Sequence, residues 1–137
     1  PNYHSGANGD FQRIHAEDHP LFRRADGSLI EYFPAHPHEG GVGAPDPTAR
    51  VVATGTSKVT GRPFNLVVAF DHADGHGRGI AESSFHHVCD YNWDTDAGCP
   101  SFVEEAPGDG YKREPHILED VKQYVANAAR WLAPDPR

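Results

Sequence analysis

The sequence predicts one domain of the α/β class, with a sheet of three or more strands, a C-terminal amphipathic helix and long ordered loops. Short apolar segments separated by turn-rich links occupy the middle of the chain. Near the end, apolar residues recur at spacings of three and four, which is the period of a helix. The 137 residues have the length of a single domain, so we expect residues 1–137 to share one core.

Three strands are predicted in the middle of the chain. Residues 50–55 are rich in β-branched side chains, residues 63–70 form a nearly continuous apolar run, and residues 79–85 make the third segment. The two links between them are rich in turn-forming residues. Three strands so close together in sequence indicate a meander or a hairpin.

One helix is predicted from Pro115 to the residue before Pro134, because proline suits a first helical turn and stops a helix that precedes it. Its outward, charged face is interpreted as solvated surface. The apolar stripe consists of Ile117, Leu118, Val121, Tyr124, Val125, Ala128, Ala129 and Leu132.

The remaining segments are predicted to be irregular. Residues 1–18 show no period, and Asp26-Gly27 marks a tight turn. Residues 33–47 hold four prolines, which exclude helix interiors and central strands and so predict a stiff, ordered loop. Residues 89–112 are too long for a simple connection, which indicates a functional loop or an ordered flap.

The net charge of -8, with 12 Lys and Arg in all, argues against nucleic acid and anionic membrane surfaces as partners. Without a membrane-length apolar run, the chain is expected to be soluble, in an undetermined compartment with the cytoplasm as the working expectation. Cys89 and Cys99 are compatible with a disulfide or with two thiols. The first residue is Pro1 and methionine is absent, so we expect a fragment of a longer protein.

Histidines on the proline-rich loop are candidate metal ligands. His36 and His38 are two residues apart on a stiff, extended backbone, so both imidazoles are expected on the same side, and Glu39 follows them. Together with His86, the two loop histidines offer the imidazole donors that zinc, iron or copper binds, so a divalent transition metal is one expected cofactor. The alternative is that the loop histidines only bond backbone groups.

A second group of candidates lies at the end of the third predicted strand, where α/β proteins place ligands. His86, His87 and Asp90 follow that strand, and Glu39 joins them if the proline-rich loop lies nearby. A histidine and carboxylate set acts as general acid and base near neutral pH, so these four residues are the predicted catalytic group. Adjacent residues on a strand face opposite ways, so one of the two histidines is expected to be structural.

The order of the short motifs resembles the C-terminal half of the ThuA-like (trehalose-utilisation) family of the class I glutamine-amidotransferase-like superfamily. The motifs are His19-Pro20, residues 75–78, His86 or His87, and Trp131, and the match spans roughly residues 19 to 134. The resemblance implies a partial flavodoxin-like sheet. It also implies that the chain is the C-terminal part of a larger ThuA-like domain and forms a homo-oligomer or associates with a missing N-terminal segment.

The sequence departs from an amidotransferase in two places. Cys89 lacks the strand-to-helix elbow of a nucleophile, and Val88 stands where the catalytic glutamate is wanted, so glutaminase chemistry is not expected. The expected function is a small-molecule site, carbohydrate-related through the resemblance, that binds, hydrolyses or isomerises its ligand with or without a metal. The alternative is a non-catalytic structural or partner-binding module, so enzyme activity is left open.

Overall fold

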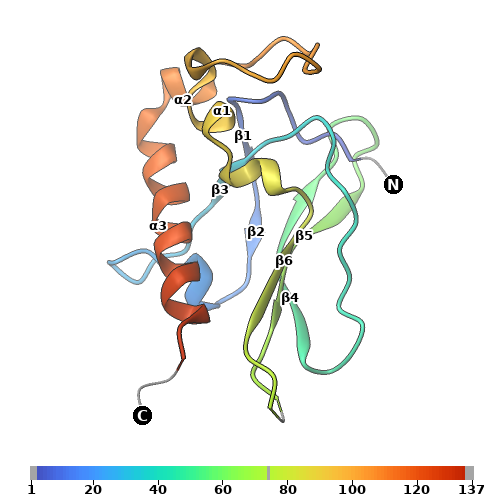
Figure 1. Cartoon of the computed structure of the whole chain (residues 1–137), viewed down its shortest axis with the longest axis vertical. Helices are drawn as coiled ribbons and strands as arrows, with labels where there is room; N and C mark the ends of the chain where they lie inside the picture. Colours follow the sequence, from blue (N-terminus) through green and yellow to red (C-terminus); the bar gives the residue numbers. More distant parts are fainter. Residues whose placement is uncertain (1–2, 74, 135–137) are drawn as a thin grey trace.

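An antiparallel sheet and a long C-terminal helix form two layers in the computed structural model, which describes residues 3–73 and 75–134 (Figure 1). The larger sheet has the strand order β2-β4-β5-β6 and the smaller pairs β1 with β3. The strands are β1 (Phe11–Arg13), β2 (His15–Ala16), β3 (Tyr32–Pro34), β4 (Ala49–Thr56), β5 (Pro63–Phe70) and β6 (Gly79–Glu82).

The three central strands confirm the predicted meander and the mixed α/β class, but a flavodoxin-like sheet is not confirmed. Each strand pairing in the described residues is antiparallel, whereas a flavodoxin-like sheet is built from parallel strands. Parallel neighbours need a crossover of about a dozen residues or more, and residues 57–62 and 71–78 are too few to make one. The short links therefore dictate hairpins.

The third strand is shorter than predicted. β6 ends at Glu82, because Ser84 accepts a hydrogen bond from the backbone N–H of His86 and begins the 3-10 helix η2. The other helices are η1 (Pro20–Phe22), α1 (Asp90–Trp93), η3 (Thr95–Ala97), α2 (Gly110–Arg113) and α3 (Pro115–Leu132), and η2 spans Phe85–Val88.

Helix α3 begins and ends where the two prolines predict, and it buries Ile117, Val121 and Tyr124. Tyr124 reaches the centre of the core, with its ring centroid 4.8 Å from that of Phe33 and 5.1 Å from that of Phe22. This aromatic cluster joins α3 to β3 and η1. The helix therefore packs against the strands that lead into the proline-rich loop and into η2.

Three motifs of the ThuA-like resemblance meet at the lower end of the molecule (Figure 1). The Arg78 guanidinium lies 5.6 Å from the centroid of the Trp131 ring and donates a hydrogen bond to the Trp131 carbonyl oxygen at 3.0 Å. Buried His19 packs edge-on against the same ring at 5.2 Å. Arg78 precedes β6 whereas His86 follows it, so this contact lies at the opposite end of the strand from the twin histidines. It fastens the end of α3 to the sheet.

The segment 89–112, called the flap below, is ordered by three short helices and covers the upper end of the molecule (Figure 1). Cys89 and Cys99, both in the flap, are not joined by a disulfide. Among the helices of the described residues, none has the length and hydrophobicity needed to cross a bilayer.

Candidate functional site

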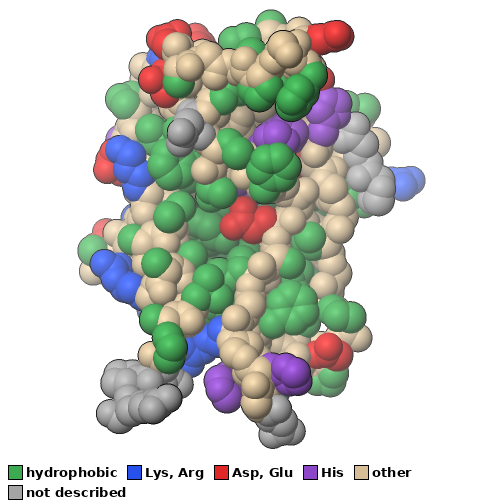
Figure 2. All heavy atoms as spheres, viewed as in Figure 1, with side chains coloured by type: hydrophobic (Ala, Val, Ile, Leu, Met, Phe, Trp, Pro, Cys, Tyr) green, Lys and Arg blue, Asp and Glu red, His purple; other side chains and the backbone are tan. Residues whose placement is uncertain are grey.

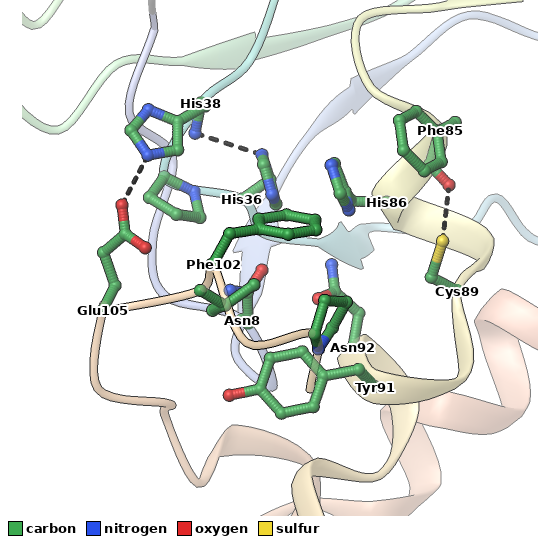
Figure 3. A pocket seen from close by; sticks show the side chains of 13 residues that line it. Asn8, His36, His38, Phe85, His86, Cys89, Tyr91, Asn92, Phe102 and Glu105 are labelled. Atoms are coloured by element: carbon green, nitrogen blue, oxygen red, sulfur yellow. Dashed lines mark hydrogen bonds and ion pairs between the residues drawn. The ribbon is translucent and has the colours of Figure 1, made fainter. Parts of the chain in front are cut away.

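The proline-rich loop and the end of β6 meet in space, as the sequence analysis expected. The rings of His36 and His86 stack with their centroids 4.1 Å apart and their planes 5° from parallel. His38 lies on the same side, with its ring 5.8 Å from that of His36 (Figure 3). Segments fifty residues apart in the chain thus present three imidazoles together.

His36 is held as a neutral ring. Its Nδ1 accepts a hydrogen bond from the backbone N–H of His38 at 3.1 Å, which places the ring proton on Nε2. Ser5 fixes the backbone on either side, since its Oγ accepts from the N–H of His36 at 2.9 Å. Burial, reinforced by His86, lowers the pKa of His36 to about 4. Burial and the charge of His87 also lower the pKa of His86.

The stacked histidines line a cavity of about 400 Å³ between the proline-rich loop, η2 and the flap. Figure 2 shows histidines beside hydrophobic side chains on this part of the surface. Phe102 and Phe85 line the cavity although they are 77% and 71% exposed. The full lining consists of Asn8, His36, Pro37, His38, Phe85, His86, Cys89, Tyr91, Asn92, Pro100, Phe102, Val103 and Glu105.

Behind the cavity, a fully buried carboxylate accepts four side-chain hydrogen bonds. Glu39 accepts from Ser5 at 2.7 Å, from Gln12 at 2.9 Å, from Ser83 at 2.6 Å and from His87 at 3.1 Å. Its backbone is fixed by a bridge to the N-terminal segment at Tyr3. Burial alone raises a carboxyl pKa, but these donors outweigh it and lower the pKa of Glu39. The carboxylate is therefore ionised at neutral pH.

His87 is buried between two carboxylates. Its Nε2 faces Glu39 at 3.1 Å and its Nδ1 faces Glu82 at 3.3 Å, while the Tyr124 hydroxyl donates to Glu82 at 2.7 Å. Burial opposes a charge on His87, yet the hydrogen bonds to Glu39 and Glu82 raise its pKa to about 9. A buried imidazolium thus links the proline-rich loop, β6 and α3.

The predicted catalytic residues occupy different places. His86 lines the cavity, whereas His87 and Glu39 have no exposed surface and lie behind it. The side chain of Asp90 lies outside the part of the chain that the structure describes. One histidine lines the cavity and the other is buried behind it, although both lie on the 3-10 helix η2 and not on a strand, so strand alternation is not the cause. Catalytic roles for the four residues stay a prediction.

The predicted metal ligands are close together but do not form a ligand set. Within residues 3–73 and 75–134, no group of three or more His, Cys, Asp or Glu side chains is arranged to hold a metal ion. His36 and His86 stack face to face, so their ring nitrogens do not converge on one point. His38 instead pairs with Glu105 of the flap, with Nε2 and Oε1 2.5 Å apart. A bound metal stays a prediction.

Several residues of this region were not found from the sequence. Glu82 could have been recognised, because a charged residue inside a strand of small and apolar residues indicates a buried partner. Nothing in the sequence around Asn8 or Phe102 indicated a role in the site. Two aromatic residues of the flap, Tyr91 and Trp93, have different roles. Tyr91 lines the cavity, but Trp93 donates to the backbone oxygen of His87 at 2.9 Å and packs the flap onto the core.

Comparison of the chain with models of protein families, with curated proteins and with solved structures found no match. The ThuA-like resemblance therefore stays a prediction, as do the larger parent domain and the homo-oligomer that it implies. The site is defined by its geometry alone.

Proposed function

We propose that the cavity binds a small, neutral, polar molecule with an apolar face, such as a carbohydrate-derived ligand. The observation that carries the proposal is the stacked pair His36 and His86 on the wall of a 400 Å³ cavity, which the exposed ring of Phe102 also lines. Ligand pockets have volumes of about 300 to 1,000 Å³ and combine apolar walls with a few polar groups. Flat aromatic faces suit the apolar face of a sugar ring.

The charges around the cavity favour a neutral ligand. Its lining, among the described residues, includes no Lys or Arg, and lowered pKa values keep His36 and His86 uncharged at pH 7. Glu105 is engaged by His38. A phosphate or carboxylate ligand would find no fixed positive charge there. Hydroxyl groups suit the uncharged rings, because His36 has Nε2–H as a donor and a neutral His86 has one donor and one acceptor.

Hydrolysis or isomerisation of that ligand is the catalytic form of the proposal. Both reactions need a group that accepts a proton, and a neutral imidazole does so near pH 7. His86 is the predicted catalytic residue that lines the cavity, so we assign it the role of general base. The fully buried Glu39 and His87 would then position η2, which carries His86.

A non-catalytic structural module is the second candidate, and the bonding of the histidines favours it. His19 Nδ1 accepts from the backbone N–H of Leu21, and His36 Nδ1 accepts from that of His38. His87 is paired with two carboxylates. Each of these rings already stabilises a loop or turn, which is all that a structural module requires.

Binding of a methyl glycoside panel (glucoside, galactoside and mannoside), followed by ¹H–¹⁵N NMR titration, tests the proposal. We expect at least one glycoside to shift the signals of the cavity residues. Phe102→Ala should weaken that binding about tenfold through loss of ring stacking. Val59→Ala is the matched control, because Val59 is 75% exposed and does not line the cavity.

Shifts that are absent from the cavity for all three glycosides would leave the structural module as the better account. The metal is tested separately by adding Zn²⁺ to the wild type and to His38→Ala. A stoichiometric zinc site that is lost in the variant would support the metal-dependent form, and equal, weak binding to both proteins would remove it.

A further inference from the structure

We infer that Asn8 selects the ligand, by accepting a hydrogen bond from a hydroxyl group of the bound molecule. The inference rests on the proposed function and adds the chemical group that the ligand must carry. Asn8 belongs to the irregular N-terminal segment, which the sequence analysis connected with no site.

The carboxamide of Asn8 is buried and lacks a partner for its oxygen. The residue is 4% exposed, and Oδ1 has no hydrogen-bond partner among the described residues. Asn8 nevertheless lines the cavity, and Figure 3 shows its side chain on the cavity floor near Phe102 and Tyr91. Buried polar atoms are almost always hydrogen-bonded, so an unpaired acceptor at a cavity wall indicates a place for a donor.

Other buried polar groups near the site differ from Asn8. Asn92 lines the same cavity, but its amide donates to the backbone oxygen of Ala35. The other unpaired atoms of the described residues belong to His4, Gln12 and Tyr111, which do not line this cavity. Among these unpaired atoms, the Asn8 oxygen is therefore the one that belongs to a residue of this cavity, and because the oxygen is buried a ligand reaches it only when a neighbouring ring moves.

Hydrogen bonds to the flap hold the backbone at Asn8 and Gly9 in place. The Asn8 carbonyl accepts from the N–H of Gly108 at 2.7 Å, and the Gly9 carbonyl accepts from that of Tyr111 at 3.2 Å. Gly9 has φ +85°, and a Cβ there would lie 2.4 Å from a Thr95 methyl carbon. The backbone that carries the acceptor is thus fixed before the ligand arrives, which lowers the entropic cost of binding.

A hydroxyl group is the partner that fits best. The unpaired oxygen requires a donor, which excludes ketones, ethers and carboxylates as the contacting group. A hydroxyl also satisfies the opposite orientation of the carboxamide, because it both donates and accepts. Phe102 lies above this floor and is 77% exposed, so few contacts oppose movement of its ring when a polyol enters.

Asn8→Leu tests the inference with the same glycoside panel. The variant keeps the volume of the side chain and removes both polar atoms. We expect binding to weaken more than tenfold, while the free energy of unfolding stays equal or rises, because an unpaired buried acceptor has been removed. In the wild-type protein, the side-chain amide signals of Asn8 should shift on addition of the glycoside, a readout that does not depend on how the variant folds.

Asn65→Leu is the matched control. Asn65 donates to the backbone oxygen of Val42 at 3.0 Å and does not line the cavity, so this variant should lose stability and keep its affinity. If a glycoside binds and Phe102→Ala weakens it, but neither Asn8→Leu nor the Asn8 amide signals respond, the inference is wrong and the proposed function stands. If no glycoside binds the wild type, both are wrong.

Discussion

At the scale of single residues, adjacent positions in the chain have opposite roles. His86 is a neutral ring in the wall of the cavity, and His87 is a charged ring in the core. The difference arises from their surroundings, since burial and the charge of His87 lower the pKa of His86, whereas His87 lies between Glu39 and Glu82. A buried charge is tolerated only when it is paired, so these two carboxylates are what permits a charged His87.

Glu39→Gln is the prediction that belongs to this scale. The substitution leaves His87 without one of its two charged partners and turns an amide N–H₂ toward groups that already donate. We expect the free energy of unfolding to fall by about 3 to 5 kcal/mol, measured by urea denaturation. The exposed Glu104→Gln should change it by less than about 0.5 kcal/mol. Equal stabilities for the two variants would contradict the role assigned to the buried pair.

At the scale of elements, the site depends on where β6 ends and on what α3 supports. Ser84 caps η2 directly after β6, so the chain turns and carries His86 toward the cavity and His87 toward Tyr124. α3 supplies the tyrosine hydroxyl that bonds Glu82. A helix that forms no part of the cavity thus holds the residues behind it.

The buried face of α3 gives the prediction at this scale. Val121 has no exposed surface and Val125, one turn later, is 36% exposed. Val121→Ala should lower the free energy of unfolding by about 2 kcal/mol, because it leaves a cavity against the core. Val125→Ala should lower the free energy of unfolding by less than half of the loss expected for Val121→Ala. Urea denaturation of the two variants makes the comparison, and similar losses would mean that α3 packs on a different face.

At the scale of the whole molecule, buried histidines shape the dependence of stability on pH. The folded-state pKa of His36, about 4, lies below its ordinary value of 6.5, so protonation favours the unfolded chain and stability falls as pH decreases from 6.5 toward 4. The lowered pKa of Glu39 acts in the same direction. The folded-state pKa of His87, about 9, lies above 6.5, so its contribution is full below pH 6.5 and is lost as pH rises through 9.

We therefore expect the free energy of unfolding to be greatest near pH 6.5 and to decrease on both sides, in urea denaturation between pH 3.5 and 9.5. His87→Gln should flatten the alkaline side and retain most of the acid dependence, since His36 is unchanged. An alkaline decrease that persists in His87→Gln would show that another group causes it.

The parts of the fold that local pattern controls were predictable from the sequence. The prolines at 115 and 134 bounded α3, while β-branched runs and turn-rich links gave β4 and β5. The apolar stripe predicted the buried residues of α3 in part, since Ile117, Val121 and Tyr124 are buried but Val125 and Leu132 are exposed. These features depend on residues close together in the chain, so they can be predicted from one sequence. The boundary of β6 was predicted three residues too late, because the Ser84 cap competes with strand pairing.

By itself, the sequence determined the helix, the meander and the two histidine segments from which the site is made. The stacking of His36 on His86, the burial of Glu39 and His87 behind them and the place of Asn8 in their cavity arise from folding across the core. The physical reason is that pKa, burial and hydrogen bonding are set by residues distant in the chain. No local pattern specifies which of these residues approach one another across the core.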